Sequence, residues 1–176
     1  MKIDRISEWH LTAADEAAIA ALLESAFDVG FGGRTFYKQR HHLRLVMRDG
    51  DAVVGHMALC YRAVRLGGRL VDIVGLAEVA TDPARQGQGV ASRLLPEAIA
   101  AARETRAEFL LLFGDRPLYA GAGFVAFPDN PMRWTGMDGA ATGETCTGVS
   151  ETLMVLPLAG AAWDGAADLD LMGPLF

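Results

Sequence analysis

Apolar residues recur along this chain at two spacings, every three to four positions in some segments and every second position in others. The first spacing is typical of an amphipathic helix and the second of a half-buried strand. Residues 13–27 follow the helical spacing and are expected to form a helix. Thr12 is placed to cap this helix, and Glu16 adds an acidic residue to its first turn. Further helices are predicted over residues 89–106, over residues 35–41, and as a short helix that Asp115 caps, with Pro117 in its first turn.

Strand-like runs account for most of the remaining periodic segments. Asp49-Gly50 and Gly67-Gly68 are turn signals that typically join antiparallel strands. Residues 129–150, which are rich in Gly and Thr, are predicted to be loop, and residues 159–176 show little periodicity. Strands are predicted, in chain order, at residues 3–7, 43–48, 52–65, 69–81, 109–113, 124–127 and 152–158.

No internal repeat, low-complexity segment or linker divides the 176 residues, so a single domain covering residues 1–176 is expected. The uninterrupted apolar run at residues 109–113 is typical of a buried parallel strand, which joins the antiparallel hairpins in one sheet. The order of elements therefore predicts an α+β fold with a mixed, mostly antiparallel central sheet flanked by helices.

Composition narrows the classes of partner. A net charge of −6 argues against nucleic acid and favours a cationic acceptor such as an amine. The cysteines and histidines lack metal-ligand spacing, so no metal is expected. No apolar run is long enough to cross a bilayer, and the first residues lack the apolar core of a signal peptide. We therefore expect a cytoplasmic protein without a membrane partner, with Cys60 and Cys146 as buried or reduced thiols.

Residues 82–92 carry the most specific chemical signal, because a strand leads into a loop of small residues that opens a helix. Gly87 and Gly89 allow close approach of a ligand, and N–H groups at a helix start attract phosphate. The dinucleotide pattern G-x-G-x-x-G fails, because Ser92 occupies the third glycine position. No Gly-Lys-Ser/Thr follows either, which excludes the P-loop pattern.

Two motifs together resemble one superfamily. The segment Gln86-x-x-Gly89-x-Ala91 is similar to the Q/R-x-x-G-x-G/A signature of the GNAT superfamily of acyl-CoA N-acyltransferases. The second marker of that superfamily ends in Tyr-x-x-x-Gly-Phe, which matches the run from Tyr119 to Phe124, although Leu118 stands where an aromatic residue is usual. The resemblance implies the GNAT fold and acetyl-CoA as cosubstrate.

The resemblance also assigns the residues that would bind coenzyme A. Backbone N–H groups of the loop would hold its pyrophosphate, and the strand before the loop would pair with its pantetheine arm. An N–H near Val79 would bind the thioester oxygen. The residues implied are Val79, Ala80, Thr81, Gln86, Gly87, Gln88, Gly89, Val90, Ala91 and Ser92.

Acyl transfer to an amine further needs an acid for the leaving thiolate and a base for the amine. Tyr119 occupies the position of the family's acid, and Glu78 lies on the strand where many relatives carry an acidic residue. His56 is an alternative base, and ordered water with backbone carbonyls is another route. An acyl-enzyme on Cys60 is disfavoured, because that residue lies mid-strand without an evident base.

A narrower resemblance links the middle and end of the chain to aminoglycoside 2′-N-acetyltransferases and the nodulation acyltransferases. It rests on the run from Gly55 to Leu59, on Arg62 and Gly68, and on the run from Val155 to Leu158. The chain departs from the aminoglycoside enzymes at Ala77, where they carry a strand glutamate.

The function expected is acetyl transfer from acetyl-CoA to a primary amine of a small molecule or amino sugar, by direct attack. The alternative functions are a protein N-acetyltransferase and a non-catalytic acyl-CoA-binding sensor module. For the oligomeric state, a homodimer is considered. Residues 27–42 and 129–150 are expected to build the acceptor pocket, with His41 and His42 flanking the acceptor.

Overall fold

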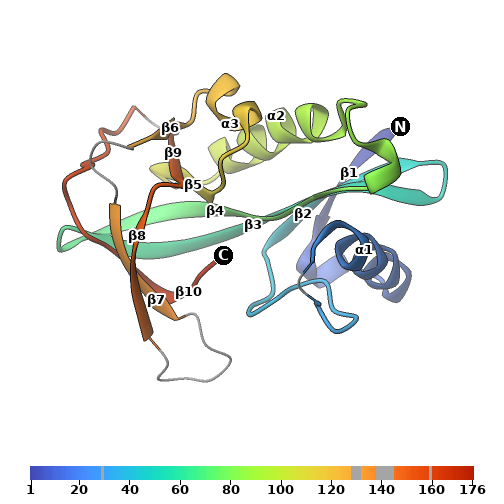
Figure 1. The fold of residues 1–176 in the computed structure, drawn as a ribbon, viewed down its shortest axis with the longest axis horizontal. Coiled ribbons are helices and arrows are strands. Elements are labelled where there is room, and N and C mark those ends of the chain that lie inside the picture. The colour runs from blue at the N-terminus through green and yellow to red at the C-terminus, as the bar shows by residue number, and fades with distance from the viewer. Residues whose placement is uncertain (29, 128–131, 138–144, 159) are drawn as a thin grey trace. The chain divides into compact units, whose positions relative to one another are not determined.

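The structure is a computed structural model that describes residues 1–28, 30–127, 132–137, 145–158 and 160–176 (Figure 1). It divides the chain into two compact units. The first comprises Met1–Cys60 and Leu76–Ala101, and the second comprises Tyr61–Gly75 and Ala102–Phe176. Two long strands, β3 (Ala52–Leu66) and β4 (Arg69–Thr81), contribute residues to both units.

The first unit is built on antiparallel strands. β1 (Lys2–Ser7) pairs with β2 (Leu43–Asp49), which pairs in turn with β3. A turn of 3-10 helix, η1 (Glu8–His10), follows β1. Gly50 has a φ of +61° in the turn between β2 and β3, which explains the glycine that follows Asp49. The predicted strands and the first hairpin are therefore confirmed.

Helix α1 (Ala13–Ala26) begins with a capping box, as its sequence favours. The Thr12 hydroxyl accepts the Asp15 N–H, while the Asp15 carboxylate accepts the Thr12 N–H at 3.1 Å. The predicted helix and cap are confirmed, and Asp15 is the acidic residue that completes the cap. Buried apolar side chains of α1 pack against Val46 of β2 and Ala80 of β4.

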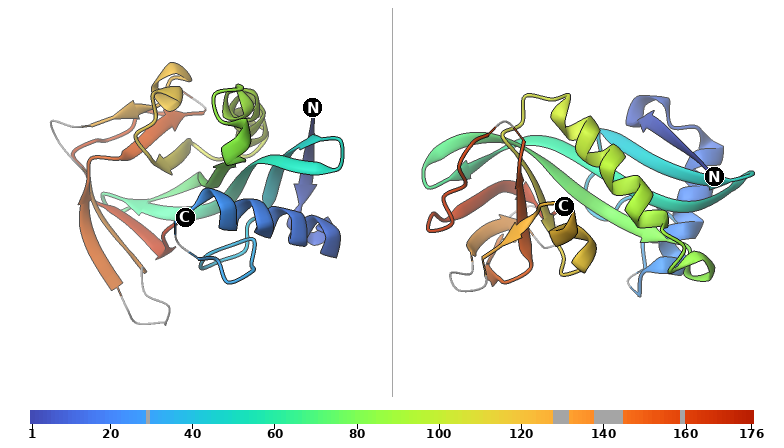
Figure 2. Two further views of the ribbon diagram at one scale, coloured as in Figure 1. Left: turned by 45° about the vertical axis from the view of Figure 1, so that its right-hand side comes forward. Right: turned by 90° about the horizontal axis from the view of Figure 1, so that it is seen from above.

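Helix α2 (Val90–Arg103) lies on the opposite side of these strands from α1, as both Figure 1 and Figure 2 show. Gly55 of β3 is the point of closest approach. A Cβ atom at Gly55 would overlap the Val90 side chain and lie 2.9 Å from Cδ1 of Leu94. Only a glycine at this position lets the first turns of α2 rest directly on the β3 backbone.

The second unit contains a mixed sheet with strand order β6-β9-β5-β4-β3-β10-β7-β8. β4 pairs in parallel with β5, and β10 in parallel with β7, whereas β9 is antiparallel to β5 and β6. This confirms the predicted mixed α+β fold. The elements are β5 (Phe109–Phe113), α3 (Pro117–Gly121), β6 (Val125–Ala126), β7 (Met132–Met137), β8 (Thr145–Ser150), β9 (Leu153–Pro157) and β10 (Leu169–Pro174).

Three local predictions were wrong, and one strand in the tail was not predicted. Residues 35–41 form bends rather than a helix, because Arg44 bonds to the backbone and hydroxyl of Thr35 and so fixes that segment from outside. Asp115 does not cap α3, whose N-cap is Arg116 without a side-chain bond.

Residues 129–150 contain the paired strands β7 and β8, and the tail contains β10. Both corrections reflect backbone pairing between distant segments, which local propensity does not reveal. Residues 128–131 and 138–144 of the predicted loop lie outside the described residues.

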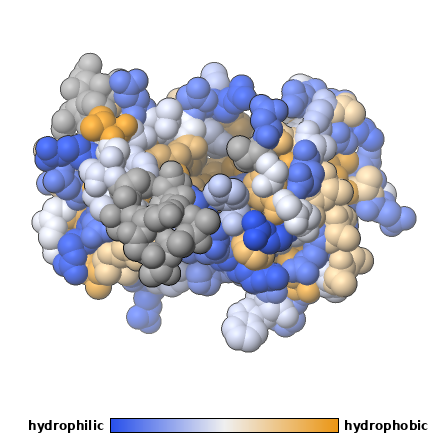
Figure 3. All heavy atoms as spheres, turned by 60° about the horizontal axis from the view of Figure 1, so that its bottom comes forward, coloured by the Kyte–Doolittle hydropathy of each residue, from blue (hydrophilic) through white to orange (hydrophobic). Residues whose placement is uncertain are grey.

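The surface carries isolated exposed hydrophobic residues, of which Trp9 is 94% exposed. On the face drawn in Figure 3, hydrophobic and hydrophilic residues are interspersed. In the part of the chain that the structure describes, no helix combines the length and apolar character needed to span a membrane.

Candidate active site

The loop between β4 and α2 has the backbone geometry that its glycines suggested. Asp82 accepts the Ala84 N–H and begins the 3-10 helix η2 (Pro83–Arg85). Gly87 and Gly89 then both have a φ of +76°, a conformation that side chains with a Cβ rarely adopt. A Cβ at either glycine would have no atom within 4 Å, so the surface above them is open.

The start of α2 presents donors to this open surface. The first helical bond runs from the Arg93 N–H to the Gly89 carbonyl at 3.1 Å, so the N–H groups of Val90, Ala91 and Ser92 have no partner within the helix. The helix dipole adds positive potential at the same place. The backbone N–H of Gln88 instead donates to the Arg85 carbonyl at 3.3 Å. One of the N–H groups predicted to hold phosphate is therefore already hydrogen-bonded within the loop.

Charged side chains near this loop have protein partners. Arg85 pairs with Asp49 at 2.8 Å, and Arg93 donates to the carbonyl of Met1 at 3.4 Å. The Asp49 carboxylate offsets the charge of Arg85, whereas Arg93 bonds to a neutral carbonyl and keeps its charge near the start of α2. Of the predicted strand contacts, Ala80 is buried against α1, while Val79 and Thr81 are half-buried.

Glu78 has an unusual backbone conformation within β4. Its φ of +48° lies in the left-handed region, which a residue with a side chain enters only at a cost. Its side chain is 15% exposed, and its carboxylate lies 3.9 Å from Nε2 of His41. Burial raises the pKa of the Glu78 carboxyl, and the Tyr37 N–H and the Arg44 charge partly oppose this rise. A raised pKa makes the carboxylate a better proton acceptor than an exposed glutamate.

Arg44 and His56 form a buried polar connection to Glu78. Arg44 has no exposed surface, yet its guanidinium bonds to Glu8 at 2.8 Å and to the Thr35 carbonyl at 2.8 Å. It also lies 3.2 Å from Nε2 of His56, whose Nδ1 is 2.8 Å from the Glu78 carbonyl. Sequence reasoning missed Arg44, although an arginine within the apolar run of residues 43–47 was a visible signal.

The histidines near Glu78 are buried to different extents. Burial and the Arg44 charge lower the pKa of His41 to about 2 and that of His56 to about 3, so both rings are neutral at pH 7. His56 is not available as a base, because Arg44 donates to its Nε2 lone pair. His42 is exposed, and its N–H bonds to Leu59. Cys60 is buried, as expected, and takes part in no disulfide.

Tyr119 belongs to the second unit, where it lies on α3 and is 6% exposed. Its ring packs edge-on against Phe124 with centroids 6.0 Å apart, and a Cβ at Gly114 would lie 3.0 Å from it. The Tyr-x-x-x-Gly-Phe motif is thus partly a packing unit. Burial raises the pKa of the Tyr119 hydroxyl, which keeps the group protonated and able to donate at neutral pH.

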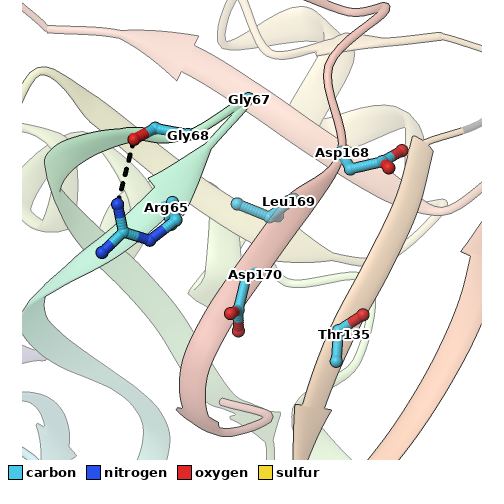
Figure 4. A pocket seen from close by; sticks show the side chains of 7 residues that line it. All are labelled: Arg65, Gly67, Gly68, Thr135, Asp168, Leu169 and Asp170. Atoms are coloured by element: carbon cyan, nitrogen blue, oxygen red, sulfur yellow. Dashed lines mark hydrogen bonds between the residues drawn. The ribbon is translucent and has the colours of Figure 1, made fainter.

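A separate cavity of about 290 Å³ lies in the second unit beside the β3–β4 turn (Figure 4). Its polar groups already have protein partners. Arg65 donates to the Gly68 carbonyl, Asp168 pairs with Arg133, and Asp170 accepts the Met172 N–H. Among the described residues, no group of three or more His, Cys, Asp or Glu side chains could hold a metal ion.

Comparison with known proteins identifies the class. Residues 9–126 match the family model of the acetyltransferase (GNAT) domain. The chain is 30% identical over 133 residues to the uncharacterized N-acetyltransferase YhbS of Escherichia coli K12, an overlap that covers 72% of this chain and 78% of YhbS.

Solved structures share the fold. The structure of YhbS from Escherichia coli in complex with CoA superimposes with a TM-score of 0.67 at 23% identity, over 97% of this chain and 89% of that one. A GNAT family acetyltransferase from Brucella melitensis in complex with acetyl-CoA gives a TM-score of 0.60 at 23% identity, over 96% and 94%. The fold of this chain is thus shared with both of these structures. The chain belongs to the GNAT acetyltransferase family.

Proposed function

We propose that this enzyme transfers an acetyl group from acetyl-CoA to a primary amine of a small molecule or amino sugar. The observation that carries the proposal is the loop at residues 86–92, where two left-handed glycines precede unpaired helix N–H groups. This arrangement suits a pyrophosphate. Two proteins of the same fold, from Brucella melitensis and Escherichia coli, were solved with acetyl-CoA and with CoA, which supports the same cosubstrate here.

The reaction proposed is direct attack. The amine nitrogen forms a bond to the thioester carbon, and the carbon–sulfur bond breaks. The Val79 N–H stabilises the negative charge that develops on the thioester oxygen. The Glu78 carboxylate takes the proton that the amine loses, and the Tyr119 hydroxyl supplies a proton to the departing thiolate. The burial of Cys60 is consistent with a route that needs no acyl-enzyme.

Changing Gly89 to glutamate tests the phosphate site. The substitution adds a negative charge where phosphate would bind, at a position with space for the side chain. We expect acetyl-CoA affinity in calorimetric titration to fall at least about tenfold, or roughly 1.4 kcal/mol. Gly50→Glu is the matched control, because Gly50 also has a positive φ and an open surround but lies in a hairpin turn. Equal affinities of the two variants would refute the site.

Changing Glu78 to glutamine tests the base. We expect kcat to fall at least about tenfold, because the amide cannot accept the amine proton. In the wild type, activity should fall as the pH drops through the raised pKa of Glu78, at a pH above the ordinary glutamate value of 4.5. This acidic limb should be absent in the variant. A variant that keeps both the rate and the limb would assign proton removal to water.

The acceptor is found by measuring acetyl-CoA-dependent thiol release. One arm of the screen contains small amines and amino sugars, and the other contains peptides with free N-termini and lysines. The proposed function predicts turnover in the first arm. Turnover confined to the peptide arm would make the enzyme a protein acetyltransferase, and CoA binding without turnover in either arm would favour a sensor module.

A further inference from the structure

We propose that Arg44 and His56 are positioning residues that hold the β4 backbone at Glu78 in its left-handed conformation, and thereby aim the Val79 N–H. This inference rests on the proposed function, since it explains how the oxyanion donor of that reaction is oriented. Neither side chain is assigned a role in the reaction above, although both are fully buried and polar.

The contact with Arg44 determines the tautomer of His56. A guanidinium can only donate hydrogen bonds, so the contact with Arg44 at 3.2 Å makes Nε2 of His56 the acceptor. The proton of the neutral ring then resides on Nδ1, which donates to the Glu78 carbonyl at 2.8 Å. Arg44 therefore determines which ring nitrogen faces Glu78 as a donor.

Hydrogen bonds to Glu8 and Thr35 allow Arg44 to remain buried and fixed. Glu8 accepts from two of its nitrogens, at 2.8 and 3.3 Å, and the Thr35 carbonyl and hydroxyl accept at 2.8 and 3.1 Å. The negative charge of Glu8 compensates the positive charge of Arg44, and the N–H donors of the guanidinium all have acceptors nearby. This network holds the guanidinium in one orientation against His56.

The hydrogen bond from His56 to the Glu78 carbonyl also restrains the β4 backbone. A non-glycine residue in the left-handed region is disfavoured relative to ordinary strand geometry, so neighbouring contacts must hold it there. The hydrogen bond from His56 holds the carbonyl oxygen of Glu78 in place, and Glu78 is the residue with a φ of +48°. In a buried, low-dielectric setting such a bond is stronger than at the surface.

The same restraint extends to the Val79 N–H, the proposed oxyanion donor. The Glu78 carbonyl and the Val79 N–H belong to the same planar trans peptide, in which they point in opposite directions. A bond that fixes the carbonyl oxygen toward His56 therefore aims the Val79 N–H away from it. His56 thus acts on the thioester site through a peptide plane, without contact with the ligand.

The test compares two ligands. Acetyl-CoA engages both the loop and the β4 backbone in the proposed mode, whereas adenosine 3′,5′-bisphosphate carries phosphates but no pantetheine or thioester. We expect His56→Leu, which removes both ring nitrogens, to weaken acetyl-CoA binding about tenfold in calorimetric titration. Binding of the bisphosphate should change less than about twofold, because the loop at residues 86–92 is untouched.

Two further variants separate positioning from general destabilisation. His56→Asn keeps a side-chain N–H near the place of Nδ1 and should bind acetyl-CoA within about twofold of the wild type. Glu78→Gly allows a positive φ without restraint, so adding His56→Leu to Glu78→Gly should weaken acetyl-CoA binding little further. If His56→Leu does not fold, the asparagine variant decides, and a tenfold loss there contradicts the inference.

Other outcomes are equally distinct. Unchanged acetyl-CoA binding in a folded His56→Leu variant overturns the inference, as does an equal loss of both ligands. A wild-type protein that binds neither ligand instead contradicts the proposed function, so the two failures cannot be confused.

Discussion

Replacing Tyr119 with phenylalanine is expected to lower kcat by about 100- to 10,000-fold, the usual contribution of a general acid. The change removes only the hydroxyl, so the edge-on contact with Phe124 should persist. Acetyl-CoA affinity should stay within about twofold of the wild type, because the proposed binding groups are backbone donors of the loop and β4. The loss should therefore appear in kcat and not in cosubstrate binding.

The pH dependence of this variant provides a second readout. Burial raises the pKa of Tyr119 above its ordinary value of 10.0, so wild-type activity should decline only as the pH rises through that raised value. The alkaline limb should disappear in Tyr119→Phe. Tyr61→Phe is a suitable control, since Tyr61 is a 36% exposed tyrosine of the same unit. A Tyr119 variant with wild-type turnover at every pH would leave the residue a packing role only.

The free energy of unfolding is expected to fall by up to about 4 kcal/mol between pH 7 and pH 5. His41 and His56 have folded pKa values of about 2 and about 3, against an ordinary value of 6.5. Between these values the unfolded chain binds more protons than the folded one, so stability rises with pH and is lost as the pH falls below 6.5. Each neutral histidine accounts for about 2 kcal/mol of this loss. Glu78 acts in the opposite sense, because its pKa is raised.

Urea unfolding at the two pH values measures this effect. His41→Leu should reduce the fall in unfolding free energy by about half, whereas His10→Gln, at an exposed histidine, should leave it unchanged. Equal unfolding free energies at pH 7 and pH 5 would mean that the two buried rings accept protons without loss of the fold.

Features determined by neighbours in sequence could be predicted. The capping box of α1, the glycine turns of the hairpins and the left-handed glycines of the loop all depend on residues a few positions apart. The connection from Arg44 through His56 to Glu78 could not be predicted from the sequence. It joins three strands and depends on the β2–β3 register, which places Val46 opposite His56. The strand β10 was missed for a similar reason. It pairs with Leu66 of β3 and Trp134 of β7, far away in the chain.

The contact of α2 with Gly55 sets the position of the helix start that we propose binds the cosubstrate. Val90 is both the first residue of α2 and the residue whose side chain lies on Gly55. The depth of that contact therefore determines how far the helix start, with its donors, projects from β3. A methyl group at position 55 would displace the start of α2, where we propose that phosphate binds, although residue 55 itself would not contact the ligand. Residue 55 is thus a place where variation between relatives, or deliberate engineering, can tune affinity for the acyl donor independently of the loop sequence.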